Sequence, residues 1–186
     1  DPNTGVLYVP SRTAPMMVVL TEPDPDVSDL RYVRSGTLGP GSAHPARPAL
    51  PRGPQGLPLV KPPYSRMTAI DMNTGEHIWV VPTGEGNRFR RNPLLRDLDL
   101  APLGGDAANS GPLVTKTLLI YCLTAGGTTG GPRMVAYAKD TGAELASVDL
   151  PAGAIGTPMT YNVDGRQYIA LTVGGGPRLV AFALPR

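Results

Sequence analysis

A short glycine-rich segment holds the carboxylate with the best prospect of chemistry. Leu103, Gly104 and Gly105 precede Asp106 in the sequence. Glycines let the backbone approach a flat ligand closely. The competing interpretation, which the statistics of buried residues favour, makes Asp106 a solvated loop carboxylate.

Two further candidates have plainer structural interpretations. Trp79 could stack on a cofactor, but a lone tryptophan within a strand is more often a core residue. Asp71 could act as a base, but beside a turn it is expected to accept hydrogen bonds from nearby backbone N–H groups. We therefore predict no catalytic residue in this chain.

Metal-binding side chains do not gather at a usable spacing. His44 and His77 lie far apart without a second ligand nearby, whereas zinc needs three or four convergent groups. The acidic residues Asp24, Asp26 and Asp29 lack the glycine and glutamate of a calcium-binding loop. We therefore predict no metal site.

Composition excludes several classes of partner. The formal net charge is +2, and only Arg88, Arg90 and Arg91 cluster, so no basic stripe for nucleic acid is present. The single cysteine, Cys122, excludes an internal disulfide and is expected to be a small buried hydrophobic residue. The chain has 23 glycines and 22 prolines, which break helix interiors and favour a turn-rich all-β protein.

Short apolar runs bounded by turn residues predict the strands. They are rich in Val, Ile, Leu, Tyr and Thr, and none shows a sustained helical period. One helical turn is expected within residues 94–103, confined by Pro93 and Pro102. The predicted strands are residues 6–9, 16–20, 67–70, 77–81, 118–123, 134–137, 144–150, 159–163, 168–173 and 179–183.

An internal repeat links these strands. The stretch from Ala69 to Trp79 aligns with the stretch from Ala136 to Ala146, and both place a Thr-Gly turn between two strands. Asp164-Gly165 predicts a two-residue type I′ hairpin, which needs positive φ at both positions. Repeats with several strands each indicate β-propeller blades.

Counting strands gives about two to three four-stranded antiparallel blades. The repeat over residues 111–150 is whole, while the first and last repeats each lack one strand. A closed ring needs more blades, so we expect residues 1–186 to be the C-terminal blades of a longer protein whose upstream blades are partners. Residues 22–64 are predicted to be a Pro/Gly-rich loop insertion without strands, and residues 85–110 an inter-blade insertion.

The repeats resemble those of the pyrroloquinoline quinone (PQQ) dependent dehydrogenases. Ala69 to Trp79 resembles their tryptophan-docking motif, and the stretches 150–161, 164–176 and 180–185 resemble their C-terminal end. The resemblance implies an eight-bladed quinoprotein propeller that binds PQQ with Ca²⁺. It also implies oxidation of an aldose sugar or an alcohol, with hydride transfer to the quinone. The membrane-bound glucose and alcohol dehydrogenases are the most similar type.

Residue by residue, the resemblance transfers little. Trp79 matches the docking tryptophan, whereas the second repeat has Ala138 and Ala146 in place of Asp and Trp. The family has a glycine pair beside the cofactor. Leu103, Gly104 and Gly105 match it and Asp106 follows, so the resemblance implies that these four residues bind the cofactor. The catalytic base, the metal ligands and the asparagine that touches PQQ are expected upstream of Asp1.

The resemblance also implies partners and a location. A quinone or cytochrome would accept the electrons, and the protein would be periplasmic, with a membrane anchor in a preceding segment. The fragment alone is expected to be inactive. The alternative is a non-catalytic PQQ-like propeller that serves as a scaffold for protein contacts, because fold alone does not settle function.

Overall fold

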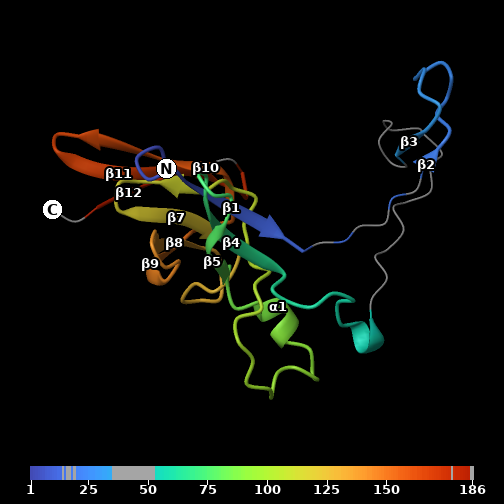
Figure 1. Cartoon of the computed structure of the whole chain (residues 1–186), viewed down its shortest axis with the longest axis horizontal. Coiled ribbons are helices and arrows are strands. Elements are labelled where there is room, and N and C mark those ends of the chain that lie inside the picture. Colours follow the sequence, from blue (N-terminus) through green and yellow to red (C-terminus); the bar gives the residue numbers. More distant parts are fainter. Residues whose placement is uncertain (14, 16–17, 19, 35–52, 177, 185–186) are drawn as a thin grey trace. The chain divides into compact units, whose positions relative to one another are not determined.

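The computed structural model describes residues 1–13, 15, 18, 20–34, 53–176 and 178–184. The chain divides into two compact units, which are described separately. The first comprises residues 1–13 and 61–186, and the second comprises residues 14–60. The predicted all-β class is confirmed, because almost all regular structure is antiparallel sheet (Figure 1).

The first sheet combines strands that are far apart in the sequence. Its order is β1 (Val6–Arg12), β4 (Ser65–Asp71) and β5 (His77–Pro82), all antiparallel. The register of β1 and β4 runs from Val6 opposite Asp71 to Arg12 opposite Ser65. The chain therefore leaves this sheet after Arg12 and returns at the neighbouring position.

The second sheet is the complete repeat that the sequence predicts. It contains β6 (Leu113–Val114), β7 (Leu118–Leu123), β8 (Arg133–Ala138) and β9 (Glu144–Asp149) in sequential order. Strand β7 is buried along almost its whole length, while every residue of β9 is exposed. The sheet therefore has an interior strand and a solvated outer edge.

The third sheet contains β10 (Ala154–Val163), β11 (Arg166–Val173) and β12 (Arg178–Ala183). Asp164 and Gly165 join the first two strands with φ values of 51° and 75°, which confirms the predicted type I′ hairpin. Strand β10 begins earlier than predicted. A register shift between Ile155 and Met159 lets pairing continue past Gly156, whose φ is 80°.

Two apolar clusters hold the three sheets together. One joins the first and second sheets through Tyr8, Met67, Leu119 and Val135, with Trp79 packed against it. The other joins the second and third sheets through buried residues that include Ile120, Cys122, Leu171 and Val173. Cys122 is fully buried, so its predicted role as a buried hydrophobic residue is confirmed.

The second unit contains a small hairpin of β2 (Leu20–Thr21) and β3 (Val33–Arg34). Asp24 initiates the turn between them, since its side chain accepts a hydrogen bond from the Asp26 backbone nitrogen at 3.0 Å. The prediction of no strand within residues 22–64 is therefore wrong at 33–34. This pair is too short to show an alternating pattern. Most of the strand predicted at 16–20 lies outside the described residues. A 3₁₀ turn, η1 (Pro54–Gly56), follows.

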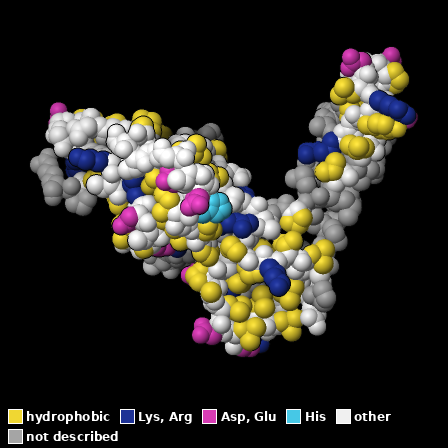
Figure 2. Space-filling view, viewed as in Figure 1, with side chains coloured by type: hydrophobic (Ala, Val, Ile, Leu, Met, Phe, Trp, Pro, Cys, Tyr) yellow, Lys and Arg dark blue, Asp and Glu magenta, His cyan; other side chains and the backbone are white. Residues whose placement is uncertain are grey.

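The helical turn predicted within residues 94–103 is wrong in position, because α1 spans Asn87–Arg90. Residues 92–98 form turns after it, held by backbone hydrogen bonds such as Leu95 N to Asn92 O at 2.9 Å. Arg90 fixes the segment by ion pairing with Glu85 at 3.2 Å and donating to the Leu100 carbonyl at 2.6 Å. Figure 2 shows hydrophobic side chains gathered over α1 and this loop.

Within the described ranges, no helix has the length and apolar character to cross a membrane.

Candidate functional site

Asp71 organises the turn between β4 and β5. Its Oδ1 accepts a hydrogen bond from the Asn73 backbone nitrogen at 2.8 Å, and its carbonyl accepts one from Gly75 at 2.7 Å. Gly75 has a φ of 77°, which glycine adopts without strain. The predicted turn-stabilising role of Asp71 is confirmed.

Trp79 joins the first sheet to the second. Its indole nitrogen donates a hydrogen bond to the Lys139 carbonyl at 3.0 Å, and the Tyr8 hydroxyl donates to the same carbonyl at 3.2 Å. The Lys139 ammonium donates in turn to the Thr115 carbonyl at 3.1 Å and forms an ion pair with Asp1. These contacts give Trp79 a structural role, as predicted.

The segment Leu103, Gly104, Gly105 and Asp106 packs tightly against its own chain. A Cβ atom on Gly104 would lie 2.2 Å from the Ser65 carbonyl oxygen, and one on Gly105 would lie 2.6 Å from the Phe89 ring. The Gly105 nitrogen donates to the Ser65 hydroxyl at 2.6 Å. In this structure the two glycines therefore allow a close approach between protein segments. Assigning all four residues to cofactor binding stays a prediction.

Asp106 is not the solvated loop carboxylate that the sequence favours. Its side chain is 2% exposed, and its Oδ2 accepts a hydrogen bond from the Gly86 backbone nitrogen at 2.8 Å. Its carbonyl accepts from both the backbone nitrogen and the hydroxyl of Thr124, at 2.6 and 3.0 Å. Asp106 thus ties the loop before the second sheet to β7 and to residues 84–86.

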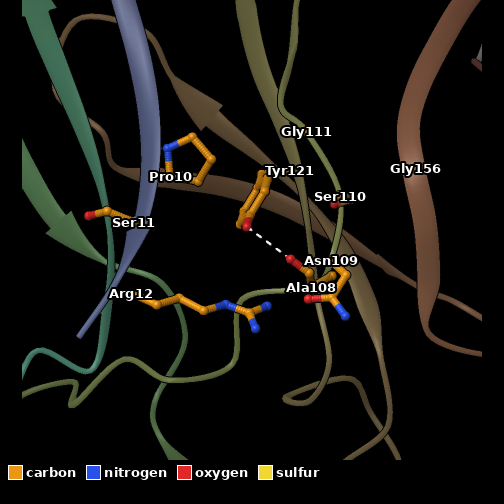
Figure 3. Close-up of a pocket in the computed structure, with 9 residues that line it drawn as sticks. All are labelled: Pro10, Ser11, Arg12, Ala108, Asn109, Ser110, Gly111, Tyr121 and Gly156. Carbon is orange, nitrogen blue, oxygen red and sulfur yellow. Dashed lines mark hydrogen bonds between the residues drawn. The ribbon is translucent and has the colours of Figure 1, made fainter. Parts of the chain in front are cut away.

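An open pocket lies just beyond this segment. It has a volume of about 380 Å³ and is lined by residues 10–12 of β1, residues 108–111, Tyr121 and Gly156 (Figure 3). None of the four predicted residues lines it. Instead, residues 108–111 lead directly into β6, the first strand of the complete repeat. Residues 108–111, and not the predicted segment 103–106, therefore border the pocket.

Backbone contacts at the pocket connect the segment before β6 to the start of β10. Asn109 forms an isolated parallel bridge with Ile155, and the Gly156 nitrogen donates to the Asn109 carbonyl at 3.3 Å. A Cβ atom on Gly111 would lie 2.4 Å from the Thr157 hydroxyl oxygen. The second and third sheets therefore converge at the pocket, and the first sheet adds Arg12 from the opposite side.

The polar residues that line the pocket include Arg12, Asn109 and Ser110. Arg12 extends from β1 toward Ala108 and Asn109, and its guanidinium donates to the Ala107 carbonyl (Figure 3). The Ser110 hydroxyl is buried and has no hydrogen-bond partner of good geometry among the described residues. It does lie near the Cys122 thiol. Burial raises the pKa of that thiol to about 11, and the nearby Ser110 hydroxyl partly offsets the rise.

Tyr121 forms the floor of the pocket. Its hydroxyl donates to the Ala108 carbonyl at 3.2 Å (Figure 3). Burial raises the pKa of this hydroxyl, and the Arg12 guanidinium partly offsets that rise. Arg12 is the one charged side chain among the described residues that line the pocket, so its chemistry favours ligands with anionic or carbonyl oxygens.

The other sequence candidates do not join this pocket. His77 is exposed on β5, and His44 lies outside the described residues. No group of three or more His, Cys, Asp or Glu side chains is placed to hold a metal ion in the described parts of the chain. Arg12, Asn109 and Ser110 escaped the sequence analysis, because no motif marks them and β1 meets this loop only in three dimensions.

Comparisons with known proteins converge on one family. The model of the PQQ family, described as the β-propeller domain of glucose/ethanol/alcohol dehydrogenases, matches residues 1–169. The chain is 33% identical over 140 residues to a quinate/shikimate dehydrogenase (quinone) of Acinetobacter baylyi, covering 70% of this chain and 17% of that protein. It is 31% identical over 144 residues to the quinoprotein glucose dehydrogenase of Escherichia coli, with 71% and 17% covered.

A solved structure agrees with these relatives. The quinohemoprotein alcohol dehydrogenase of Comamonas testosteroni superposes with a TM-score of 0.52 at 26% identity, covering 95% of this chain and 21% of that one. The three stacked sheets therefore form part of a β-propeller, as predicted. The chain spans about a sixth of the length of the curated relatives it matches.

Proposed function

The chain belongs to the PQQ β-propeller family of glucose/ethanol/alcohol dehydrogenases, and from this premise we propose that it forms one wall of a cofactor and substrate site. The whole protein would oxidise an aldose sugar or an alcohol. PQQ, when bound, supplies the hydride acceptor. This fragment would supply binding and orientation and would be inactive alone. The pocket at the mouth of β6 is the observation that supports the proposal.

The residues around the pocket suit a quinone that carries carboxylates. Such a ligand needs hydrogen-bond donors and close backbone contact. Arg12 and Asn109 offer donors. Gly111 and Gly156 keep the wall free of side chains. We place the cofactor against residues 109–111.

The predicted segment 103–106 would then support this wall from behind. Asp106 accepts hydrogen bonds from the Gly86 nitrogen and the Thr124 hydroxyl. These bonds fix the start of the loop that continues to Asn109. Gly104 and Gly105 let that loop sit directly on Ser65 and Phe89. Any effect of these residues on cofactor affinity would act through the position of the loop.

The remaining features of the proposal concern the whole protein. A calcium ion bound with the cofactor would take its ligands from other parts of the protein, since the described residues hold no acidic cluster for it. The electron acceptor would be a quinone or a cytochrome. The location would be periplasmic, with a membrane anchor in a preceding segment, and cell fractionation tests it.

Cofactor binding to the full-length protein tests the central proposal. We expect PQQ to quench tryptophan fluorescence saturably, and dye reduction to follow with glucose, glycerol, ethanol or quinate. Asn109→Ala should weaken PQQ binding by about tenfold, the effect of one lost hydrogen bond. The matched control is Asn162→Ala on the exposed part of β10, which should change nothing. A full-length protein that binds no PQQ would instead be a scaffold.

A further inference from the structure

The rim of the pocket carries a cation with no acidic partner. Arg12 ends β1, is exposed, and forms no ion pair within the described residues. Its guanidinium donates to the Ala107 carbonyl, and the side chain extends from β1 toward Ala108 and Asn109 (Figure 3). An arginine has five N–H donors in a fixed fork, so one such bond leaves donors for a planar anion.

The surroundings favour a carboxylate over a neutral hydroxyl. Among the described residues, the pocket lining contributes one positive charge and no negative charge. Arg12 and Tyr121 both line the pocket, so the guanidinium and the floor border the same space. Bidentate binding to a carboxylate is stronger and more directional than a hydrogen bond to a hydroxyl. The pocket therefore discriminates between ligands by charge.

The position of Arg12 separates the two possible sources of that carboxylate. The proposed cofactor wall, residues 109–111, is held by the second and third sheets, whereas Arg12 comes from the first sheet across the pocket. With the cofactor against residues 109–111, the side that carries Arg12 is left for the substrate. We propose that Arg12 binds a carboxylate of the substrate, so that hydroxy acids are preferred over neutral sugars and alcohols. This inference rests on the proposed function.

Paired substrates test the inference in the full-length protein loaded with PQQ. Quinate and methyl quinate share the ring and its hydroxyls and differ in charge, and shikimate and methyl shikimate extend the comparison. We expect KM for quinate to be at least tenfold lower than for its ester. Arg12→Gln should remove that preference by raising KM for quinate at least tenfold, with KM for the ester changed less than twofold. Arg12→Lys should restore part of it.

Binding measurements keep the test independent of turnover. Calorimetry should show quinate, but not its ester, binding the PQQ-loaded wild type, with the heat lost in Arg12→Gln. Arg91→Gln is the matched control, because it removes an exposed arginine outside this pocket and should change neither KM nor binding. Circular dichroism and thermal unfolding confirm that each variant is folded.

Three outcomes would overturn the inference. The wild type could favour the neutral member of each pair, in binding as well as turnover. Arg12→Gln could affect acid and ester equally. It could also weaken PQQ binding tenfold without altering substrate preference, which would assign the carboxylate to the cofactor. By contrast, a wild type that binds no PQQ refutes the proposed function itself, a result that PQQ titration alone detects.

Discussion

The two interfaces between sheets are built in different ways. The first and second sheets meet through Trp79 and Tyr8, which both donate hydrogen bonds to the Lys139 carbonyl. The second and third sheets meet through a cluster of buried apolar residues that includes Cys122 and Leu171. The first interface adds side-chain hydrogen bonds to its packing, whereas the second adds a backbone hydrogen bond from Gly156 to the Asn109 carbonyl.

The corners of the two repeats show which residues carry the difference. Gly142 donates to the Ala138 carbonyl at 2.9 Å, the counterpart of the 2.7 Å bond from Gly75 to Asp71. The turn thus forms without the aspartate. However, Ala146 stands where the first repeat has Trp79, and the strand that carries it is exposed throughout. The Thr-Gly pair specifies the turn, and the tryptophan specifies the packing of its sheet against the next sheet.

Removing the tryptophan should have the largest effect. Trp79→Ala deletes the indole hydrogen bond and leaves a void beside Tyr8, so we expect the free energy of unfolding to fall by about 3–5 kcal/mol. Urea denaturation measures it. Ala146→Leu, on the corresponding strand of the second sheet, should change stability by less than about 0.5 kcal/mol, because that surface is solvated. Equal losses would remove the distinction between the two interfaces.

Alkaline pH should weaken the apolar interface through Cys122. Burial raises the pKa of Cys122 to about 11 from its ordinary value of 9.0. Between these values the unfolded chain loses the thiol proton while the folded chain keeps it, so stability falls as pH rises. The loss should total about 2–3 kcal/mol between pH 9 and 11. Cys122→Ala in the same buffers should lack this component, and parallel pH profiles would contradict the expectation.

Two glycines at equivalent corners should respond differently to alanine. Both have positive φ, 71° at Gly142 and 77° at Gly75, so each substitution costs about 1–2 kcal/mol of backbone strain. A Cβ on Gly142 would also lie 2.7 Å from the Trp79 ring, whereas one on Gly75 meets nothing within 4 Å. Gly142→Ala should therefore cost about 1–3 kcal/mol more. In the Trp79→Ala background that excess should shrink, and the part that remains comes from Val81, 2.9 Å from the added Cβ.

The smallest effect should come from the turn carboxylate. Asp71→Ala removes the bond to the Asn73 nitrogen but leaves the Gly75 bond, which is made by backbone. We expect a loss of about 0.5–1 kcal/mol, because the turn is exposed. Chemical denaturation beside Asp140→Ala, at the second corner, measures it. A loss above that of Gly142→Ala would show that the aspartate specifies the corner.

Most of the sheet structure was predictable from sequence because it is encoded locally. Alternating apolar residues and Thr-Gly or Asp-Gly turns fix strands and hairpins within a few residues. The extension of β10 was missed, since the shift around Gly156 breaks the alternation. The helical turn was misplaced because α1 depends on Arg90 anchoring to Glu85 and Leu100 rather than on any periodic pattern.

The site was less predictable because it is assembled from distant segments. Residues 103–106 stand out by composition. Their glycines, however, are required by the close approach of Ser65 and Phe89, and no local sequence pattern predicts that approach. Asp106 is buried because residues 84–86 fold over it, which reverses the exposure expected for a loop aspartate. Arg12 and Asn109 are nearly one hundred residues apart, and only the stacking of sheets makes them neighbours.

The point where the chain leaves the first sheet has an evolutionary consequence. Arg12 and Ser65 face each other in the register of β1 and β4, so whatever connects them begins and ends at adjacent sites. Doubling the length of such a connection costs only about 0.6 kcal/mol of closure entropy. Additional residues can thus be inserted between Arg12 and Ser65 without disturbing the sheet. Because Arg12 also borders the pocket, the connection begins beside a residue that we propose binds substrate.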